Sequence, residues 1–198
     1  MRMARFIIAV CGVLVWGYAA APPAPTAQAT NRTTNRTRAT PLILEKNEGE
    51  RRVVRGWPGH PDPGETFILK VDPKNGGSSH LVLLTADLAP GKEIVAHKHP
   101  HADEILFLQT GTARVHVGDS ARVVHAGATV FIPANTWISV DNIGNDAISL
   151  AVIFSAPGFE ELMRDGSVRE GEKNVPLSKA EDDAMQRKHS HVVIYKEP

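Results

Sequence analysis

The chain contains almost no cysteine, since Cys11 is the only one in 198 residues. A framework of disulfide bonds is therefore excluded, and a hydrophobic core must hold the fold together. An excess of one charge is also missing, because 22 basic residues balance 22 acidic residues. This balance does not indicate nucleic acid or an anionic membrane surface as a partner. We also find no Ser-His-Asp or Cys-His arrangement and no phosphate-binding glycine loop, which argues against nucleophilic hydrolysis and nucleotide chemistry.

An uncharged apolar run, residues 6–21, follows a short basic start and is too short to span a bilayer comfortably. A basic start, an apolar centre and an Ala-x-Ala ending are typical of a secretory signal peptide. We predict a signal peptide over residues 1–29, cleaved after Ala29, and hence a secreted or periplasmic protein without cysteine. Cleavage after Ala21 is the alternative site, and an uncleaved membrane anchor is the alternative interpretation.

The remainder of the chain divides by composition. Residues 22–40 are rich in Pro, Ala, Thr, Asn and Arg and lack a hydrophobic pattern, which is typical of a disordered linker. We assign residues 30–65 to this linker and an N-terminal extension, and residues 66–155 to one barrel. Residues 156–198 are assigned to a C-terminal helical segment and a final strand. The sequence indicates no second domain and no internal repeat.

Short apolar runs separated by Gly, Pro, Asn and Asp follow residue 41. Regularly spaced short strands of this kind indicate an all-β sandwich or barrel. Ser178 and Glu181 form a capping-box pattern, which predicts a short helix from Ser178 to about Lys188. We also predict a helical turn at 159–164 and a last strand at 191–195. The other predicted strands are 66–71, 80–87, 93–97, 104–109, 113–117, 122–125, 129–132, 137–141 and 147–154.

A segment with closely spaced histidines carries the strongest functional pattern. His97 and His99 are two residues apart on a predicted strand, so their side chains point to the same face. Residues 100–103 can turn the chain, and Glu104 then opens the next strand. Two imidazoles and one carboxylate can therefore converge on one point, as in metal sites that keep positions open for a substrate. The alternative is a buried polar cluster without a cation, which is costly to bury.

This segment resembles the first motif of the cupin superfamily, and residues 127–142 resemble the second motif of that family. The residues that carry the resemblance are Gly91, His97, His99, Glu104, Gly111, Gly127, Pro133 and Asn135. The resemblance covers about residues 80–155. It implies an all-β fold, a double-stranded β-helix or jelly-roll barrel. A short C-terminal helix would come after the barrel. The resemblance also implies that His97, His99, Glu104 and a second-motif histidine bind a metal inside the barrel.

The second motif departs from the family pattern, because Ile138 occupies the position of its histidine. Three interpretations follow: a three-ligand site with water in the gap, a site in which another histidine substitutes, or a pocket that has lost its metal. His101, in the turn between the ligand strands, is the best substitute, as an extra ligand or as a partner of one. His116 and His125 are expected to point outward or to lie near the surface.

We expect the metal to be a divalent transition ion: Fe, Mn, Ni, Cu or Zn. Leu106, Leu108 and Ile138 predict a small apolar pocket, with Phe131 and Trp137 at its mouth. One hypothesis is an exported metal-dependent oxygenase or decarboxylase that acts on a small organic molecule. The other is a non-enzymatic cupin that binds a metal or a small ligand. The expected partner is a small molecule. We expect no nucleic acid as a partner and, after cleavage of the signal peptide, no membrane. Whether the protein forms a homodimer stays open.

Overall fold

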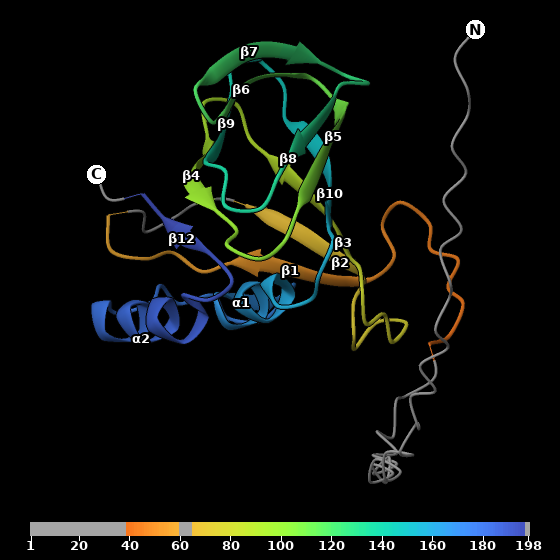
Figure 1. The fold of residues 1–198 in the computed structure, drawn as a ribbon. Coiled ribbons are helices and arrows are strands. Elements are labelled where there is room, and N and C mark those ends of the chain that lie inside the picture. Colours follow the sequence, from red (N-terminus) through yellow and green to blue (C-terminus); the bar gives the residue numbers. More distant parts are fainter. Residues whose placement is uncertain (1–38, 60–64, 197–198) are drawn as a thin grey trace, which may run out of the picture. The chain divides into compact units, whose positions relative to one another are not determined.

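The structure, a computed structural model, describes residues 39–59 and 65–196. The predicted signal peptide and its cleavage site at Ala29 lie outside these residues. The described part is an all-β fold with two short helices (Figure 1). This result confirms the predicted fold class. Neither helix in residues 39–59 and 65–196 is long and apolar enough to cross a membrane.

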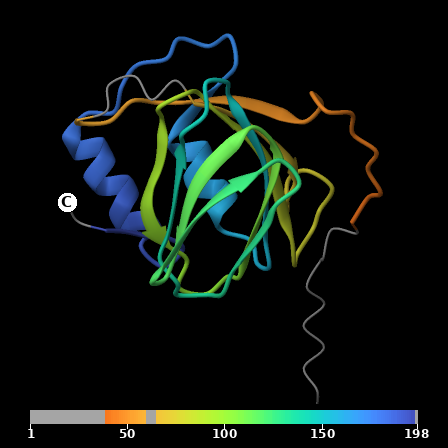
Figure 2. The same ribbon diagram turned by 90° about the horizontal axis from the view of Figure 1, so that it is seen from above.

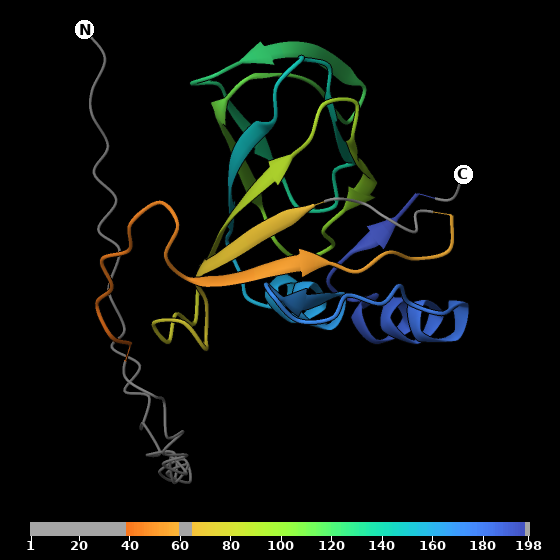
Figure 3. The same cartoon turned by 180° about the vertical axis from the view of Figure 1, so that it is seen from behind.

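The strands form two antiparallel sheets. The larger sheet has the order β11-β1-β2-β3-β10-β5-β8, and the smaller has the order β12-β4-β9-β6-β7. Seen from above in Figure 2, the strands enclose a common interior, as expected for a jelly-roll barrel. The helices lie at one end of the barrel, next to β1 (Figures 1 and 3). The elements are β1 (Glu50–Val54), β2 (Thr66–Val71), β3 (Val82–Leu88), β4 (Glu93–Lys98), β5 (Glu104–Thr110), β6 (Thr112–Val117), β7 (Ser120–His125), β8 (Thr129–Ile132), β9 (Ile138–Asn142), β10 (Ile148–Phe154), α1 (Phe159–Asp165), β11 (Ser167–Arg169), α2 (Lys179–His189) and β12 (Ile194–Tyr195).

The core forms because alternate residues of the strands point inward. On β10, Leu150, Val152 and Phe154 are buried in the core, whereas Ala151 and Ile153 between them are only half-buried. The same alternation on β5 buries Glu104, Leu106 and Leu108. Full burial of such a side chain contributes roughly 1.5–3 kcal/mol to folding. The apolar faces of both sheets thus build the interior in which the site lies.

Turn and capping residues behave as the sequence predicts. Gly111 joins β5 to β6 with φ 84°, and a Cβ there would lie 2.8 Å from Ile148 Cγ2. Asn135 adopts φ 63°, a left-handed conformation that asparagine tolerates. Ser178 caps α2 and makes both bonds of a capping box with Glu181. These bonds confirm the predicted C-terminal helix, while the final strand is shorter than predicted and spans only Ile194–Tyr195.

Two strands were not predicted from the sequence. β1 pairs with β2 and β11, and it lies in the segment assigned to the linker and N-terminal extension. The charged residues of β1 prevented its prediction as a strand, but they are ion-paired in the structure. Arg52 Nη1 lies 2.7 Å from Glu50 Oε1, and Arg164 Nη2 of α1 lies 2.8 Å from Glu50 Oε2. Buried charges are tolerated when they are paired in this way.

Candidate metal centre

The three predicted ligands come from the end of one strand and the start of another. His97 is on β4, His99 directly follows it, and Glu104 opens β5. Their exposed fractions are 6%, 3% and 3%. One ligand atom from each lies within 4.8 Å of the others. The structure therefore brings together inside the barrel the three side chains that the spacing predicted to converge.

The turn between the ligand strands is fixed by hydrogen bonds to the second motif and to the end of β10. Asn135 N donates to His99 O over 2.7 Å, and Ala134 N donates to Asp103 Oδ1 over 2.9 Å. Asp103 N donates to Ser155 Oγ over 2.9 Å. These bonds hold Glu104 opposite the histidines without a metal ion.

Backbone carbonyls determine which nitrogen of each imidazole is available. His97 Nδ1 lies 2.8 Å from Val95 O, and His99 Nδ1 lies 3.0 Å from Val192 O. Because a carbonyl can only accept, both Nδ1 atoms carry the proton. Each Nε2 then has a free lone pair, and metal-bound histidines in proteins are typically oriented by such bonds.

Two buried atoms at the centre of the cluster have no hydrogen-bond partner: His99 Nε2 and Glu104 Oε2. They lie 3.7 Å apart. Burial raises the pKa of Glu104 to about 8 and, with a smaller effect of His97, lowers the pKa of His99 to about 4. The contact is thus not an ion pair at neutral pH. Such unpaired buried atoms are costly, and a cation bound between them would satisfy both.

Aromatic rings enclose the histidines. The His99 ring centroid lies 4.7 Å from that of Phe154 and 4.9 Å from that of Phe159, which begins α1. Tyr195 of β12 lies 6.0 Å from His97 by the same measure. Phe159, Val192 and Tyr195 are contacts of the site that motif spacing could not reveal, because they follow both motifs in the sequence.

Ile138 points into the interior, as predicted, and is 1% exposed. It pairs with His97 across β4 and β9, so both side chains lie on the same face of the sheet. Leu106 and Leu108 are also buried in the core, as predicted. The position at which the family pattern has a histidine is therefore filled by an apolar side chain next to the first ligand.

The other candidate residues lie away from the cluster. His101 is exposed in the turn and is not part of the three-residue group, and His116 and His125 are exposed on their strands. Phe131 is 58% exposed because it alternates with buried Ile132. The prediction that Phe131 lines the mouth of the pocket is therefore wrong.

Trp137 also fails to line the site. It directly precedes β9 and is half-buried. Lys98 Nζ lies 5.0 Å from its ring centroid, and Lys98 alternates with inward-facing His97. The Trp137 ring therefore lies beside a side chain that points away from the barrel interior, which contradicts its predicted role.

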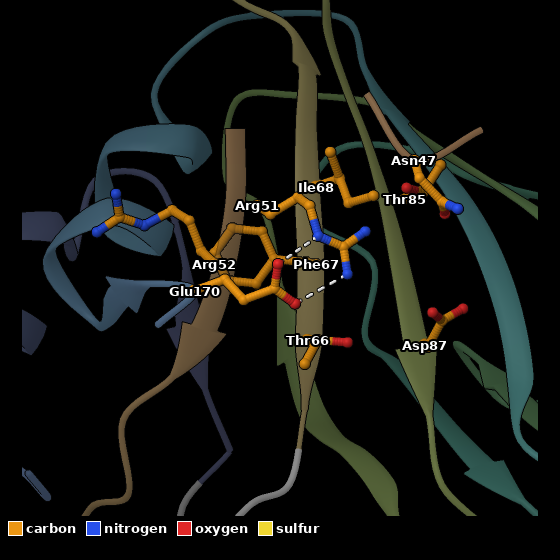
Figure 4. A pocket seen from close by; sticks show the side chains of 9 residues that line it. All are labelled: Asn47, Arg51, Arg52, Thr66, Phe67, Ile68, Thr85, Asp87 and Glu170. Atoms are coloured by element: carbon orange, nitrogen blue, oxygen red, sulfur yellow. Dashed lines mark hydrogen bonds and ion pairs between the residues drawn. The ribbon is translucent and has the colours of Figure 1, made fainter. Parts of the chain in front are cut away.

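A separate pocket lies on the outer side of β1, β2 and β3 (Figure 4). Its lining is largely polar and includes Arg51, Asp87 and Glu170. The Arg51 guanidinium donates two hydrogen bonds to Glu170, over 2.7 and 2.9 Å. Because this pair already occupies the fork of the guanidinium, we assign no ligand to the pocket.

Comparisons with known proteins agree with this fold. The family profile described as Cupin domain matches residues 84–154. The chain is 32% identical over 92 residues to mannose-1-phosphate guanylyltransferase RfbM of Salmonella typhimurium, a match that covers 46% of this chain and 19% of that protein. It is 32% identical over 104 residues to an uncharacterized protein of Acanthamoeba polyphaga mimivirus, covering 48% and 65%. The chain thus spans less than two thirds of the length of either relative.

A solved structure supports the fold independently. KdgF from Halomonas sp. superimposes with a TM-score of 0.50 at 15% identity, and the match covers 61% of this chain and 99% of that chain. At this identity the likeness shows the fold alone. The profile match shows that residues 84–154 of this chain form a cupin domain.

Proposed function

We propose that His97, His99 and Glu104 bind one divalent transition-metal ion, which is Fe, Mn, Ni, Cu or Zn. We propose that the protein uses this ion to act on a small organic molecule. The observation that carries this proposal is the unpaired facing couple of His99 Nε2 and Glu104 Oε2. Two neutral imidazoles and one carboxylate form a donor set that suits these metals. The proposed activity is that of a metal-dependent oxygenase or decarboxylase.

The bound ion would supply Lewis acidity or redox chemistry to the substrate. The residues of the chain would do the rest. His97, His99 and Glu104 would hold the ion, and the carboxylate would cancel part of its charge. Phe154 and Phe159 exclude water beside His99. We therefore propose a small, mainly apolar substrate.

A metal-binding cupin without turnover is the second candidate. Ile138 favours it, because this side chain fills the interior next to His97 and contributes no ligand. It also favours an apolar small molecule as the ligand over a charged one.

Turnover assays distinguish the two candidates. The protein loaded with each metal would be offered phenolic, dicarboxylic and sugar substrates, with oxygen uptake and product formation as readouts. Turnover that is lost in His99→Ala supports the enzyme. A wild-type protein that holds metal yet is inert to the panel contradicts the enzyme and supports the binder.

We also propose that the protein is exported, to the periplasm or out of the cell, and that it acts on a small molecule there. The basic start, the apolar run at 6–21 and the Ala-x-Ala ending support this proposal. Sequencing the N-terminus of protein recovered from outside the cytoplasm tests it. We expect Thr30 as the first residue, and Met1 would contradict the proposal. A homodimer stays a prediction, for which sedimentation is the test.

A further inference from the structure

The last residues of the described chain reach the metal centre from outside the matched cupin region. We propose that residues 189–196, here called the C-terminal clasp, position His99 for metal binding by fixing its tautomer. This inference rests on the proposed metal centre and assigns it a positioning element. The clasp begins at the last residue of α2, which is 35 residues after the end of the matched region at residue 154.

The contact that carries the proposal joins His99 Nδ1 to Val192 O over 3.0 Å. A neutral imidazole in water favours the proton on Nε2, which would block metal binding by that atom. The carbonyl of Val192 instead holds the proton on Nδ1, and so the Nε2 lone pair faces Glu104. His97 differs, because its Nδ1 donates to Val95 in its own strand. His99 therefore depends on the clasp for its tautomer, whereas His97 does not.

The clasp is anchored at its start by α1. His189 Nε2 and Lys188 Nζ both contact Asp165 Oδ2, over 2.7 and 2.5 Å. Val192 N and Val193 N then donate to His189 O over 2.8 and 3.1 Å, which closes a turn. This turn directs the next carbonyl, that of Val192, toward His99. The contacts of these two residues with Asp165 thus precede the positioning bond.

The clasp is anchored at its end by the ligand strand itself. β12 pairs with β4, with Tyr195 opposite His97, and Lys196 N donates to Ala96 O over 2.9 Å. Gly158, with φ 135°, leaves room for the clasp, because a Cβ there would lie 3.1 Å from Val192 Cγ2. The Val192 carbonyl is therefore held between two fixed points.

The experiment compares three full-length proteins and one shortened chain, in the metal-free state and during Zn²⁺ titration. They are the wild type, a chain that ends at Ser190, Asp165→Asn, and the matched control Asp183→Asn. Asp183 forms a surface pair with Lys179 on α2, so its loss leaves the clasp intact. Two-bond ¹H–¹⁵N correlation spectra report the tautomer of each histidine, and His97 serves as an internal control in every protein.

We expect both ligands of the wild type to carry the proton on Nδ1. In the shortened chain, His99 should change to the Nε2–H form while His97 does not, and Zn²⁺ affinity should fall about 10- to 100-fold. Asp165→Asn should lower the affinity in the same direction, and Asp183→Asn should leave it unchanged. An Nε2–H form of His99 in the wild type would overturn the proposal. So would unchanged affinity in both clasp variants.

Two further outcomes are informative. If the shortened chain loses the His97 signal and its far-UV dichroism, it has not folded, and the wild-type tautomer and Asp165→Asn decide the question. A wild type that shows the Nδ1–H form but binds no metal would contradict the proposed function and not the positioning bond. The two failures are therefore distinguishable.

Discussion

Ile138 lies directly opposite His97 in the pairing of β4 with β9, and both side chains face the barrel interior. Directly paired residues on one face have Cβ atoms about 4.5–5.5 Å apart. A histidine at this position would therefore lie beside the first ligand. The second motif therefore lacks a ligand at this position because of a single side chain, that of Ile138.

Replacing Ile138 with histidine should strengthen metal binding. Imidazole and the isoleucine side chain have similar volumes, and a fourth nitrogen ligand should raise Zn²⁺ affinity by about tenfold or more, which corresponds to about 1.4 kcal/mol. Isothermal titration of Ile138→His against wild type measures this change. Ile138→Leu is the control and should bind like the wild type. Equal affinity in Ile138→His would show that residue 138 does not reach the ion.

The metal-free protein should lose stability as the pH rises through neutrality. Burial raises the pKa of Glu104 from 4.5 to about 8, and burial likewise raises the pKa of Glu65 to about 7. In this window the folded state retains protons that the unfolded chain has released. The contribution of these two carboxyl groups to the free energy of unfolding therefore decreases from pH 4.5 to about 8. The lowered pKa of His99 acts in the opposite direction up to pH 6.5, so the net loss is expected above that pH.

Urea unfolding between pH 7 and 8 isolates the contribution of Glu104. The pKa of Glu65 lies at the start of this interval, and the lowered pKa of His99, about 4, lies well below it. Glu104→Gln should flatten the pH dependence there, whereas Glu65→Gln should flatten it mainly below pH 7. A slope between pH 7 and 8 that persists in Glu104→Gln would contradict the assigned burial of an uncompensated carboxyl group.

Arg164 should be the most sensitive charged residue of the scaffold. Its guanidinium lies 2.7 Å from Asp72 Oδ2 and 2.8 Å from Glu50 Oε2, and Asp72 is fully buried. Arg164→Ala would leave buried Asp72 without its ion-pair partner and Glu50 with Arg52 alone, at a cost of about 3–5 kcal/mol. Arg51→Ala removes an exposed, solvent-screened pair with Glu170 and should cost much less than Arg164→Ala. Chemical denaturation compares the two variants, and equal losses would refute this interpretation.

The repeated strands could be predicted because their physical pattern is local. Each predicted strand from 66 to 154 is present within two residues of its expected boundaries. The cluster of His97, His99 and Glu104 could also be predicted, because strand geometry determines which side chains of consecutive strands share a face. Turn residues such as Gly111 and the cap at Ser178 also report their own backbone conformation.

What could not be predicted depends on contacts between distant segments. β1 carries Glu50 and Arg52, which are compatible with a buried strand only because Arg164 lies beside them. The partner of His99 is a backbone carbonyl 93 residues away, which no side-chain pattern records. Phe131 was assigned to the site from its motif, but alternation along β8 turns it outward. Sequence spacing thus predicted which side chains cluster and not which segments orient them.

The metal content of the purified protein tests the central claim most directly. Elemental analysis after mild purification would be applied to the wild type, His97→Ala, His99→Ala and, as a control outside the cluster, His116→Ala. We predict about one divalent transition-metal ion per chain in the wild type and His116→Ala, and a large loss in the two ligand variants. Equal metal in all four proteins, or none in the wild type, would contradict the assignment of His97, His99 and Glu104 as a metal site.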